Sequence, residues 1–131
     1  MKRFDEWNEI KKETQKDKAI VGFKNRDIFF IKMGENIGFE QNGKGDSFVK
    51  PIVIVKGFNR DIFFGIPLST KVKDGKFYHE FKFNKNGKTV TNIALLSQMR
   101  LYSSKRLLNK IGMMGKNDFE IMKRKFKKLI D

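Results

Sequence analysis

The sequence predicts a mainly β domain of the α+β kind: a small SH3-like antiparallel barrel with an N-terminal helix, a short helix and a C-terminal helix. Three observations predict this class. Five apolar or alternating stretches of strand length are separated by glycine-rich turns. Helical spacing of apolar residues occurs only toward the two ends. The 131 residues, 14 of them Phe, suffice for one aromatic core, which favours a single domain over residues 1–131.

The N-terminal segment, residues 1–18, is predicted to be a helical extension. Phe4, Trp7 and Ile10 recur at helical spacing within a strongly charged stretch. Such a helix is expected to pack Trp7 on the domain, and binding of a partner is the alternative role.

The barrel is predicted to span residues 25–96. Its expected strands are 28–33, 49–56, 61–68, 77–83 and 91–96, with residues 57–60 joining the second and third as a hairpin. Alternation in the fourth strand places Phe77, His79, Phe81 and Phe83 on one face. We therefore expect the single histidine to be a core residue rather than a general base.

Residues 97–131 are predicted to form a helical end. Residues 97–100 are expected to make a helical turn, and Ser104 to cap a short helix over residues 105–110. Asn117 or Asp118 is expected to cap the final helix. The apolar stripe of that helix is Phe119, Met122, Phe126, Leu129 and Ile130.

The composition restricts the class of partner. A net charge of +14 and a pI near 10.0 indicate a polyanion, with nucleic acid first, an acidic protein second and a membrane surface third. No apolar run approaches the roughly 20 residues of a membrane span, and the first residues lack the apolar core of a signal peptide, so we expect a cytoplasmic protein. The absence of cysteine excludes disulfides, thiolate catalysis and cysteine-based zinc sites.

The candidate site centres on residues 67–71, a Pro-Leu-Ser-Thr-Lys strand end. Lys50 opens the preceding strand, so hairpin pairing would bring it near Ser69, Thr70 and Lys71. Hydroxyl groups can hydrogen-bond the non-bridging oxygens of a phosphate while lysines neutralise its charge, which is what a phosphodiester site needs. The alternative is that the cluster merely ends a strand.

A polar loop over residues 34–47 carries four glycines together with Gln41 and Lys44. Its glycines can offer backbone amides, which favours a nucleic-acid-binding loop. It is not a phosphate-binding P-loop, because no Gly-Lys-Ser/Thr triplet lies between a strand and a helix.

Four segments carry a resemblance to a known family. They are GENIGFEQNGKG, KPIVIV, GIPLSTK and LLSQMRLYSSKRLLNKIG. In this order they resemble the MazF/PemK family of toxin endoribonucleases from type II toxin–antitoxin systems, from about residue 25 to the C-terminus. The resemblance implies an SH3-like barrel and a homodimer whose groove takes single-stranded RNA. It also implies a cognate, partly disordered acidic antitoxin, and neither metal nor cofactor.

The resemblance further implies a sequence-preferring cleavage in which the ribose 2′-OH is the nucleophile, leaving 2′,3′-cyclic phosphate and 5′-OH ends. Carried over by position, the catalytic arginine of the family falls on Lys50 and its catalytic threonine on Ser69, followed by Thr70. Lys50 would stabilise the pentacoordinate phosphate and could relay a proton. The residues expected to contact RNA are Gln41, Lys44, Lys71, Gln98 and Arg100.

Three single residues depart from the family pattern: Lys50, Arg26 and Phe39, which stands where many members have serine. The loop between Gln41 and Lys50 is also longer than in compact members. Lys50 replaces a planar, bidentate arginine by a point charge. Arg26 stands where many members have glycine.

The first departure keeps one alternative open, a catalytically impaired relative that binds RNA without cutting it. A second alternative is a non-enzymatic poison that acts by protein binding, like the CcdB group. The charge of +14 suits the nuclease and the RNA binder better than the poison.

Overall fold

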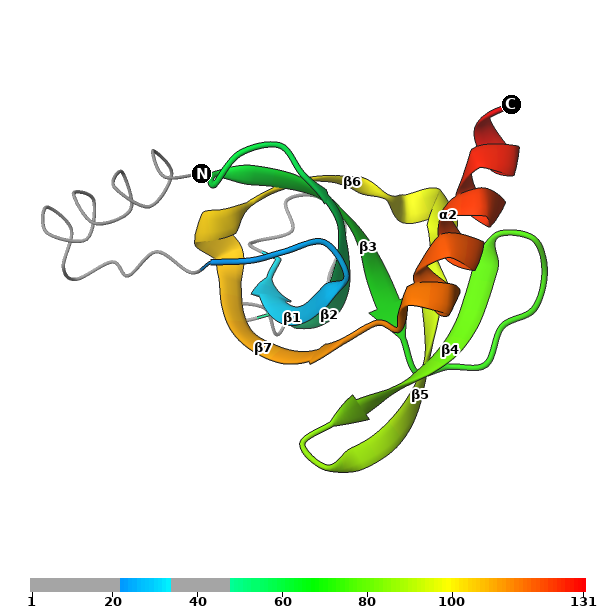
Figure 1. The fold of residues 1–131 in the computed structure, drawn as a ribbon, viewed down its shortest axis with the longest axis horizontal. Helices are drawn as coiled ribbons and strands as arrows, with labels where there is room; N and C mark the ends of the chain where they lie inside the picture. Colours follow the sequence, from blue (N-terminus) through cyan, green and yellow to red (C-terminus); the bar gives the residue numbers. More distant parts are fainter. Residues whose placement is uncertain (1–21, 34–47) are drawn as a thin grey trace, which may run out of the picture.

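Seven strands, two short 3-10 turns and a C-terminal helix make up the part of the chain that the computed structural model describes, residues 22–33 and 48–131 (Figure 1). The predicted helix over residues 1–18 and the loop with Gln41 and Lys44 lie outside these residues. The strands are β1 (Asp27–Lys32), β2 (Val49–Gly57), β3 (Ile62–Ser69), β4 (Tyr78–Lys85), β5 (Lys88–Leu95), β6 (Arg100–Ser103) and β7 (Leu107–Met113).

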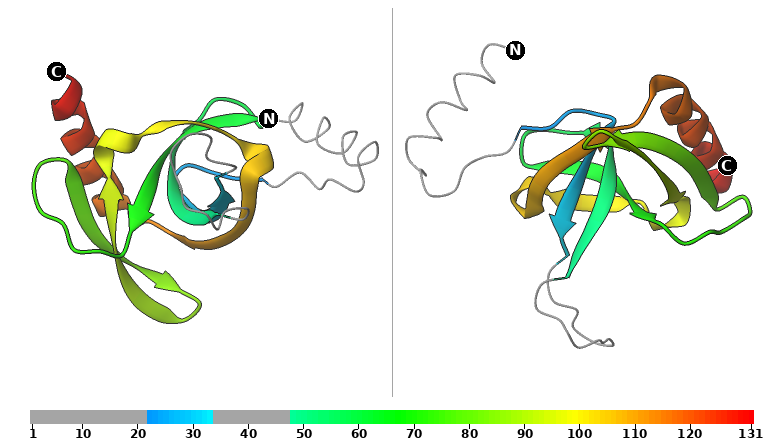
Figure 2. Two further views of the ribbon diagram at one scale, coloured as in Figure 1. Left: turned by 180° about the vertical axis from the view of Figure 1, so that it is seen from behind. Right: turned by 90° about the horizontal axis from the view of Figure 1, so that it is seen from below.

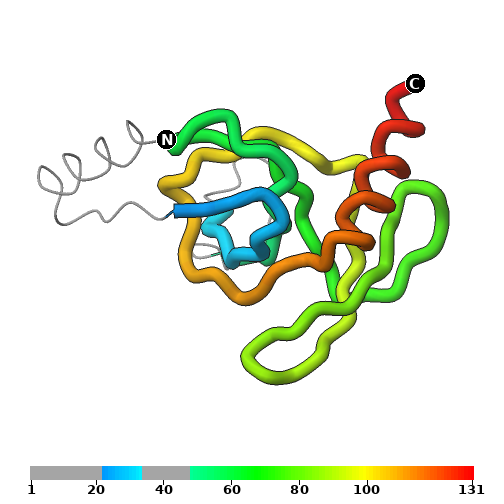
Figure 3. The backbone as a smooth tube through the Cα atoms, in the orientation of Figure 1, coloured from blue at the N-terminus to red at the C-terminus, as the bar shows by residue number. Residues whose placement is uncertain are grey.

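The sheet is antiparallel throughout, in the order β4-β5-β3-β2-β1-β7. β6 lies off this path and pairs with the first half of β3. β1, β2, β3, β6 and β7 curl around one another, while the β4–β5 hairpin extends from the curl next to the C-terminal helix (Figures 1 and 2). The backbone trace in Figure 3 shows the same curl for the described residues. The predicted class, a mainly β curled sheet with a C-terminal helix, is confirmed.

Burial on both faces explains why β1 and β2 are almost continuously apolar. Along β2, Ile52 and Ile54 belong to an inner cluster with Phe63, whereas Val53 and Val55 belong to a second cluster under the hairpin and the helix. Side chains alternate between the faces of a strand, so a strand that is covered on both sides needs apolar residues at every position.

The hairpin predicted between β2 and β3 is confirmed, with Ile52 opposite Pro67 and Val53 opposite Ile66. Asn59 stabilises its turn, because its side-chain oxygen accepts hydrogen bonds from the backbone N–H groups of Asp61 (2.7 Å) and Ile62 (3.0 Å).

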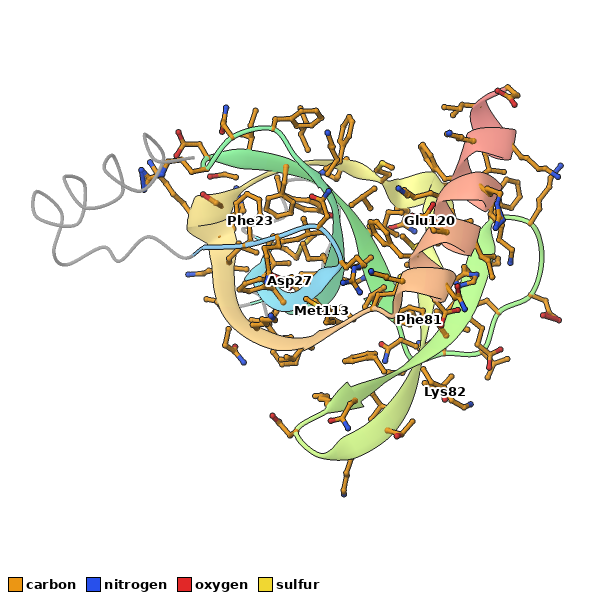
Figure 4. All side chains as sticks on the ribbon, viewed as in Figure 1. Phe23, Asp27, Phe81, Lys82, Met113 and Glu120 are labelled. Carbon is orange, nitrogen blue, oxygen red and sulfur yellow. The ribbon has the colours of Figure 1, made fainter. Side chains whose placement is uncertain are left out.

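Alternation along β4 is also confirmed, since His79, Phe81 and Phe83 are buried. Phe81 lies beside the helix while Lys82 points away from it (Figure 4). The placement of Phe77 on this face is wrong, because Phe77 precedes the strand and is 44% exposed.

The short helix expected over residues 105–110 is wrong. Only η2 (Ser104–Arg106) is helical, and the chain then continues as β7 along the free edge of β1. Lys110 forms an ion pair with buried Asp27 across this edge (3.1 Å). The curled sheet therefore extends to Met113, beyond the boundary expected at residue 96. The turn expected at residues 97–100 is confirmed as η1 (Leu96–Gln98).

The C-terminal helix, α2 (Lys116–Ile130), begins after Gly115 rather than at Asn117 or Asp118. Its Phe119 and Met122 are buried and Phe126 and Leu129 pack on the same cluster, as the stripe predicts, but Ile130 is 67% exposed. On β4, His79 contacts Asp118 through Nε2 and Oδ1 (3.1 Å), and Lys125 donates to the Tyr78 carbonyl (3.3 Å). Within the described ranges, no helix has the length and apolar character needed to cross a membrane.

Arg26 adopts the left-handed backbone conformation that favours glycine, with φ of 84°. Its backbone N–H donates to Ile54 (2.7 Å), and its carbonyl accepts from the N–H of Met114 (2.9 Å). Its guanidinium donates to the Met114 carbonyl (2.9 Å). These three bonds hold a non-glycine residue in a conformation that costs free energy.

Candidate functional site

A cavity of about 330 Å³ opens where β2, β3 and β6 come together. It gathers three of the residues that the sequence predicts for the site, Lys50, Gln98 and Arg100. Its lining residues are Met33, Lys50, Pro67, Gln98, Met99, Arg100 and Tyr102.

Lys50 lines the cavity from strand β2. It lies opposite Ile31 in the β1–β2 pair, near the start of β2. Because side chains two apart on a strand share a face, Lys50 lies on the face whose deeper residue is Ile52, within the inner cluster. Lys50 as a whole residue is half-buried beside this apolar cluster.

The segment from η1 to β6 supplies further lining residues. Buried Leu96 anchors the turn, after which Gln98 and Met99 line the cavity. Arg100 then lies opposite Gly65, and its guanidinium carbon lies 5.2 Å from the centre of the Tyr102 ring.

Tyr102 is a lining residue that the sequence did not indicate. It is 6% exposed, its ring stacks on Phe63 at 5.8 Å, and its hydroxyl has no hydrogen-bond partner among the described residues. Burial raises the pKa of this hydroxyl above 10.0, although the charge of Arg100 acts in the opposite direction. A signal existed: if β6 had been predicted as a strand, the two-residue period would have placed Tyr102 on the face of Arg100.

The predicted hydroxyl cluster is not part of the cavity wall. β3 leaves β2 after Pro67 and pairs with β5 through Leu68 and Ser69. The Ser69 hydroxyl oxygen accepts a hydrogen bond from the backbone N–H of Lys71 (3.1 Å), while Thr70 and Lys71 are exposed. Pro67 lines the cavity, and Ser69 follows it about 7 Å farther along the strand.

The lining combines two cations, one amide and one hydroxyl with the apolar side chains of Met33, Pro67 and Met99. None of these lining residues is acidic. Such a set can hold an anion by charge-assisted hydrogen bonds while a flat ring or sugar contacts the apolar side chains. Among residues 22–33 and 48–131, no three His, Asp or Glu side chains gather in a way that could hold a metal ion.

Comparisons with known proteins bear on the fold. The sequence matches no family model and no curated protein. Solved structures do match, and the curled antiparallel sheet with its C-terminal helix is a MazF-like fold. One of them is the crystal structure of MazF (Form-I) from Deinococcus radiodurans, with a TM-score of 0.61, 11% identity, and coverage of 84% of this chain and 97% of that one. At this identity the likeness concerns the fold alone.

Proposed function

We propose that this protein is the toxin of a type II toxin–antitoxin system and a metal-independent, sequence-preferring endoribonuclease that cleaves single-stranded RNA. The observation that carries the proposal is the cavity in which Lys50, Gln98 and Arg100 meet on a MazF-like fold. The net charge of +14 supports a polyanionic substrate.

The chemistry makes modest demands on the protein. The ribose 2′-OH loses its proton and its oxygen bonds to the adjacent phosphorus, the bond to the 5′-oxygen breaks, and that oxygen takes up a proton. Because the nucleophile is already tethered beside phosphorus, the protein must hold the phosphate, stabilise the developing charge and assist the proton transfers.

Each site residue has a proposed part in this reaction. Lys50 stabilises the pentacoordinate phosphate, and Arg100, which lines the same cavity, supplies the planar donor pair that a lysine lacks. Ser69 and Thr70, which follow the lining residue Pro67 along the chain, bind phosphate oxygens once the Ser69 hydroxyl turns from Lys71 toward the substrate. Gln98 contacts a base, and Gln41, Lys44 and Lys71 contact the flanking RNA.

The proposal extends to partners and location. We infer a cytoplasmic homodimer, together with a cognate acidic antitoxin that covers the RNA-binding surface. Electrostatic complementarity with a chain of charge +14 favours such a partner.

The test is incubation of the purified protein with a long unstructured RNA in excess EDTA, followed by mapping of fragment ends. We expect 2′,3′-cyclic phosphate and 5′-OH ends. Lys50→Ala should lower the cleavage rate by at least about 100-fold, because it removes a charge from the phosphate. The melting temperature should change little, since Lys50 is not a fully buried residue. Lys82→Ala, which removes an exposed lysine of the β4–β5 hairpin, is the matched control.

Cleavage by Lys50→Ala at the wild-type rate would remove Lys50 from the reaction. The replacement of arginine by Lys50 favours one second candidate, an impaired relative that binds RNA. In that case the wild-type protein would bind the RNA with a steep salt dependence and leave it intact.

A further inference from the structure

Residues 70–77 link β3 to β4 and form an exposed segment with three lysines against one aspartate. The segment ends at Phe77, which is 44% exposed. Figures 1 and 2 show the start of β4 beside α2, where the Lys125 ammonium donates to the Tyr78 carbonyl (3.3 Å). Lysines from the linking segment and from α2 therefore meet around two adjacent aromatic residues.

Printed as a group, the basic–aromatic cluster consists of Lys73, Lys76, Phe77, Tyr78 and Lys125. The Lys73 ammonium lies 5.9 Å from the centre of the Tyr78 ring, and the Lys76 ammonium 5.8 Å from the centre of the Phe77 ring. The two rings meet edge to face, with their centres 6.4 Å apart. Cation–π attraction favours this arrangement and keeps the lysines close to the rings.

The positive charge of the cluster is available to an anion. Within residues 22–33 and 48–131, the lysines paired with an acidic side chain are Lys110 and Lys123, and neither belongs to the cluster. Lys125 uses one of its three N–H donors on the Tyr78 carbonyl. Proteins bind single-stranded nucleic acid with exposed aromatic rings bordered by cations, because the ring stacks on a base while the cations bind phosphates.

The backbone connects the cluster to the cavity. The Phe77 carbonyl accepts a hydrogen bond from the N–H of Leu96 (3.0 Å), where η1 begins, and Gln98 at the end of η1 lines the cavity. Residues paired across two strands are about 5.5 Å apart and two residues span at most about 7 Å, so the Phe77 and Gln98 backbones lie within roughly 13 Å. The cluster is therefore close enough for one RNA strand to contact it and the cavity together.

We propose that Phe77 stacks on a base of the RNA outside the cavity. The three lysines of the cluster bind the phosphates beside that base. This inference rests on the proposed function and extends its RNA-binding surface to the start of β4. Stacking discriminates little between bases, so the cluster adds affinity rather than sequence preference.

The test compares Phe77→Leu with wild type, because leucine keeps an apolar side chain and removes the aromatic face. Phe58→Leu is the matched control, since Phe58 is 48% exposed and lies in the turn at the other end of β3. Affinity is measured with a non-cleavable 2′-O-methyl oligonucleotide copied from the unstructured RNA of the cleavage test. Phe77→Leu should weaken it by roughly 5- to 50-fold, the effect of losing one stacked base. Phe58→Leu should leave it unchanged.

Two further ligands separate stacking from charge. A fully abasic strand of the same length keeps its phosphates and has no bases, so Phe77→Leu should bind it as tightly as wild type does. Polyglutamate stands for an acidic protein, and its affinity should likewise be independent of Phe77. Lys73→Ala should weaken binding of the oligonucleotide and of the abasic strand, and make the slope of log affinity against log salt shallower by about 0.7.

A third measurement keeps an aromatic ring at the position. Phe77→Trp should bind the oligonucleotide at least as tightly as wild type, and stacking should quench its added fluorescence. The emission of Trp7, the single tryptophan of the chain, is measured in the wild-type protein and subtracted. Phe58→Trp should show no such quenching. This measurement decides the matter if Phe77→Leu fails to fold.

The outcomes separate this inference from the proposed function. If wild type cleaves RNA and Phe77→Leu binds the oligonucleotide equally well, the inference fails and the function stands. If wild type binds RNA without cleaving it, the cleavage proposal fails, and the affinities still decide on Phe77.

Two other results would overturn the inference. Equal weakening for the oligonucleotide and the abasic strand would show that Phe77 stacks on no base. Dependence of polyglutamate binding, but not of RNA binding, on Phe77 would make the cluster a surface for an acidic protein. If wild type binds no RNA, the inference and the proposed function both fail.

Discussion

At the scale of single residues, Lys50 decides how the cavity can treat a phosphate. A lysine ammonium is a compact point charge, whereas a guanidinium offers a planar pair of donors that matches two phosphate oxygens. Arg100 lines the same cavity of about 330 Å³. One planar donor group and one point charge are therefore available to the same anion.

We expect Lys50→Arg to cleave RNA at least as fast as wild type and up to about tenfold faster, since it restores bidentate donation. Lys50→Gln, which lacks the charge, should be inactive. Rates in excess EDTA on one RNA measure both. A Lys50→Arg protein much slower than wild type would contradict charge stabilisation as the sole part of Lys50, because arginine holds its proton too firmly to release it. It would indicate that Lys50 transfers a proton.

At the scale of elements, the His79–Asp118 contact joins β4 to α2. The Nε2 atom of His79 lies 3.1 Å from Oδ1 of Asp118, and its Nδ1 atom is buried without a partner among the described residues. Protonation would place a second N–H on Nδ1, where no acceptor receives it. Burial accordingly lowers the pKa of His79 below 6.5. Lys125 adds to this effect, and Asp118 opposes it without reversing it.

This pKa direction predicts that stability depends on pH. The unfolded chain binds a proton at His79 near pH 6.5, before the folded chain does, so the free energy of unfolding should fall as pH drops below 6.5 and level off below the folded pKa. Urea unfolding between pH 8 and 5 of wild type and His79→Gln measures the effect. As pH falls, the free energy of unfolding of wild type should decrease relative to that of His79→Gln. A difference that stays constant with pH would contradict a lowered pKa.

Elements whose signals are local could be predicted, and elements that depend on a distant partner could not. The apolar runs of β1 to β3 and the alternation of β4 are visible in short windows. In β7, Leu107 and Ile111 are buried with exposed residues between them, a spacing that also fits a helix. Its strand conformation comes from the free edge of β1, with register shifts along the pair, and this tertiary effect overrides local preference.

The residues of the candidate site likewise divide into those that local motifs predict and those whose position depends on strand pairing. Lys50, Gln98 and Arg100 could be named because their motifs are local, although strand pairing alone brings them together. Tyr102 was missed because it lies on β6, a four-residue strand that the sequence did not indicate. Ser69 and Thr70 were placed by extending the β2–β3 hairpin, and the transfer of β3 to β5 after Pro67 could not be foreseen from either strand.

At the scale of the whole molecule, the charge of +14 far exceeds the two cations of the cavity wall. α2 alone carries six lysines and arginines against two acidic residues. The overall field raises the rate at which RNA arrives, whereas residues that touch phosphates fix how many counterions binding releases.

Salt dependence distinguishes the two contributions. For a single strand, each phosphate contact adds about −0.7 to the slope of log affinity against log salt. Lys50→Ala and Arg100→Ala should each make the slope shallower by about 0.7, when the affinity for a non-cleavable oligonucleotide is measured between 50 and 200 mM salt. Lys82→Ala lowers the net charge by the same single unit but removes no cavity contact, so its slope should equal that of wild type. Equal slope changes in all three variants would mean that the diffuse charge of the surface binds the RNA. The cavity would then not be the phosphate-binding site.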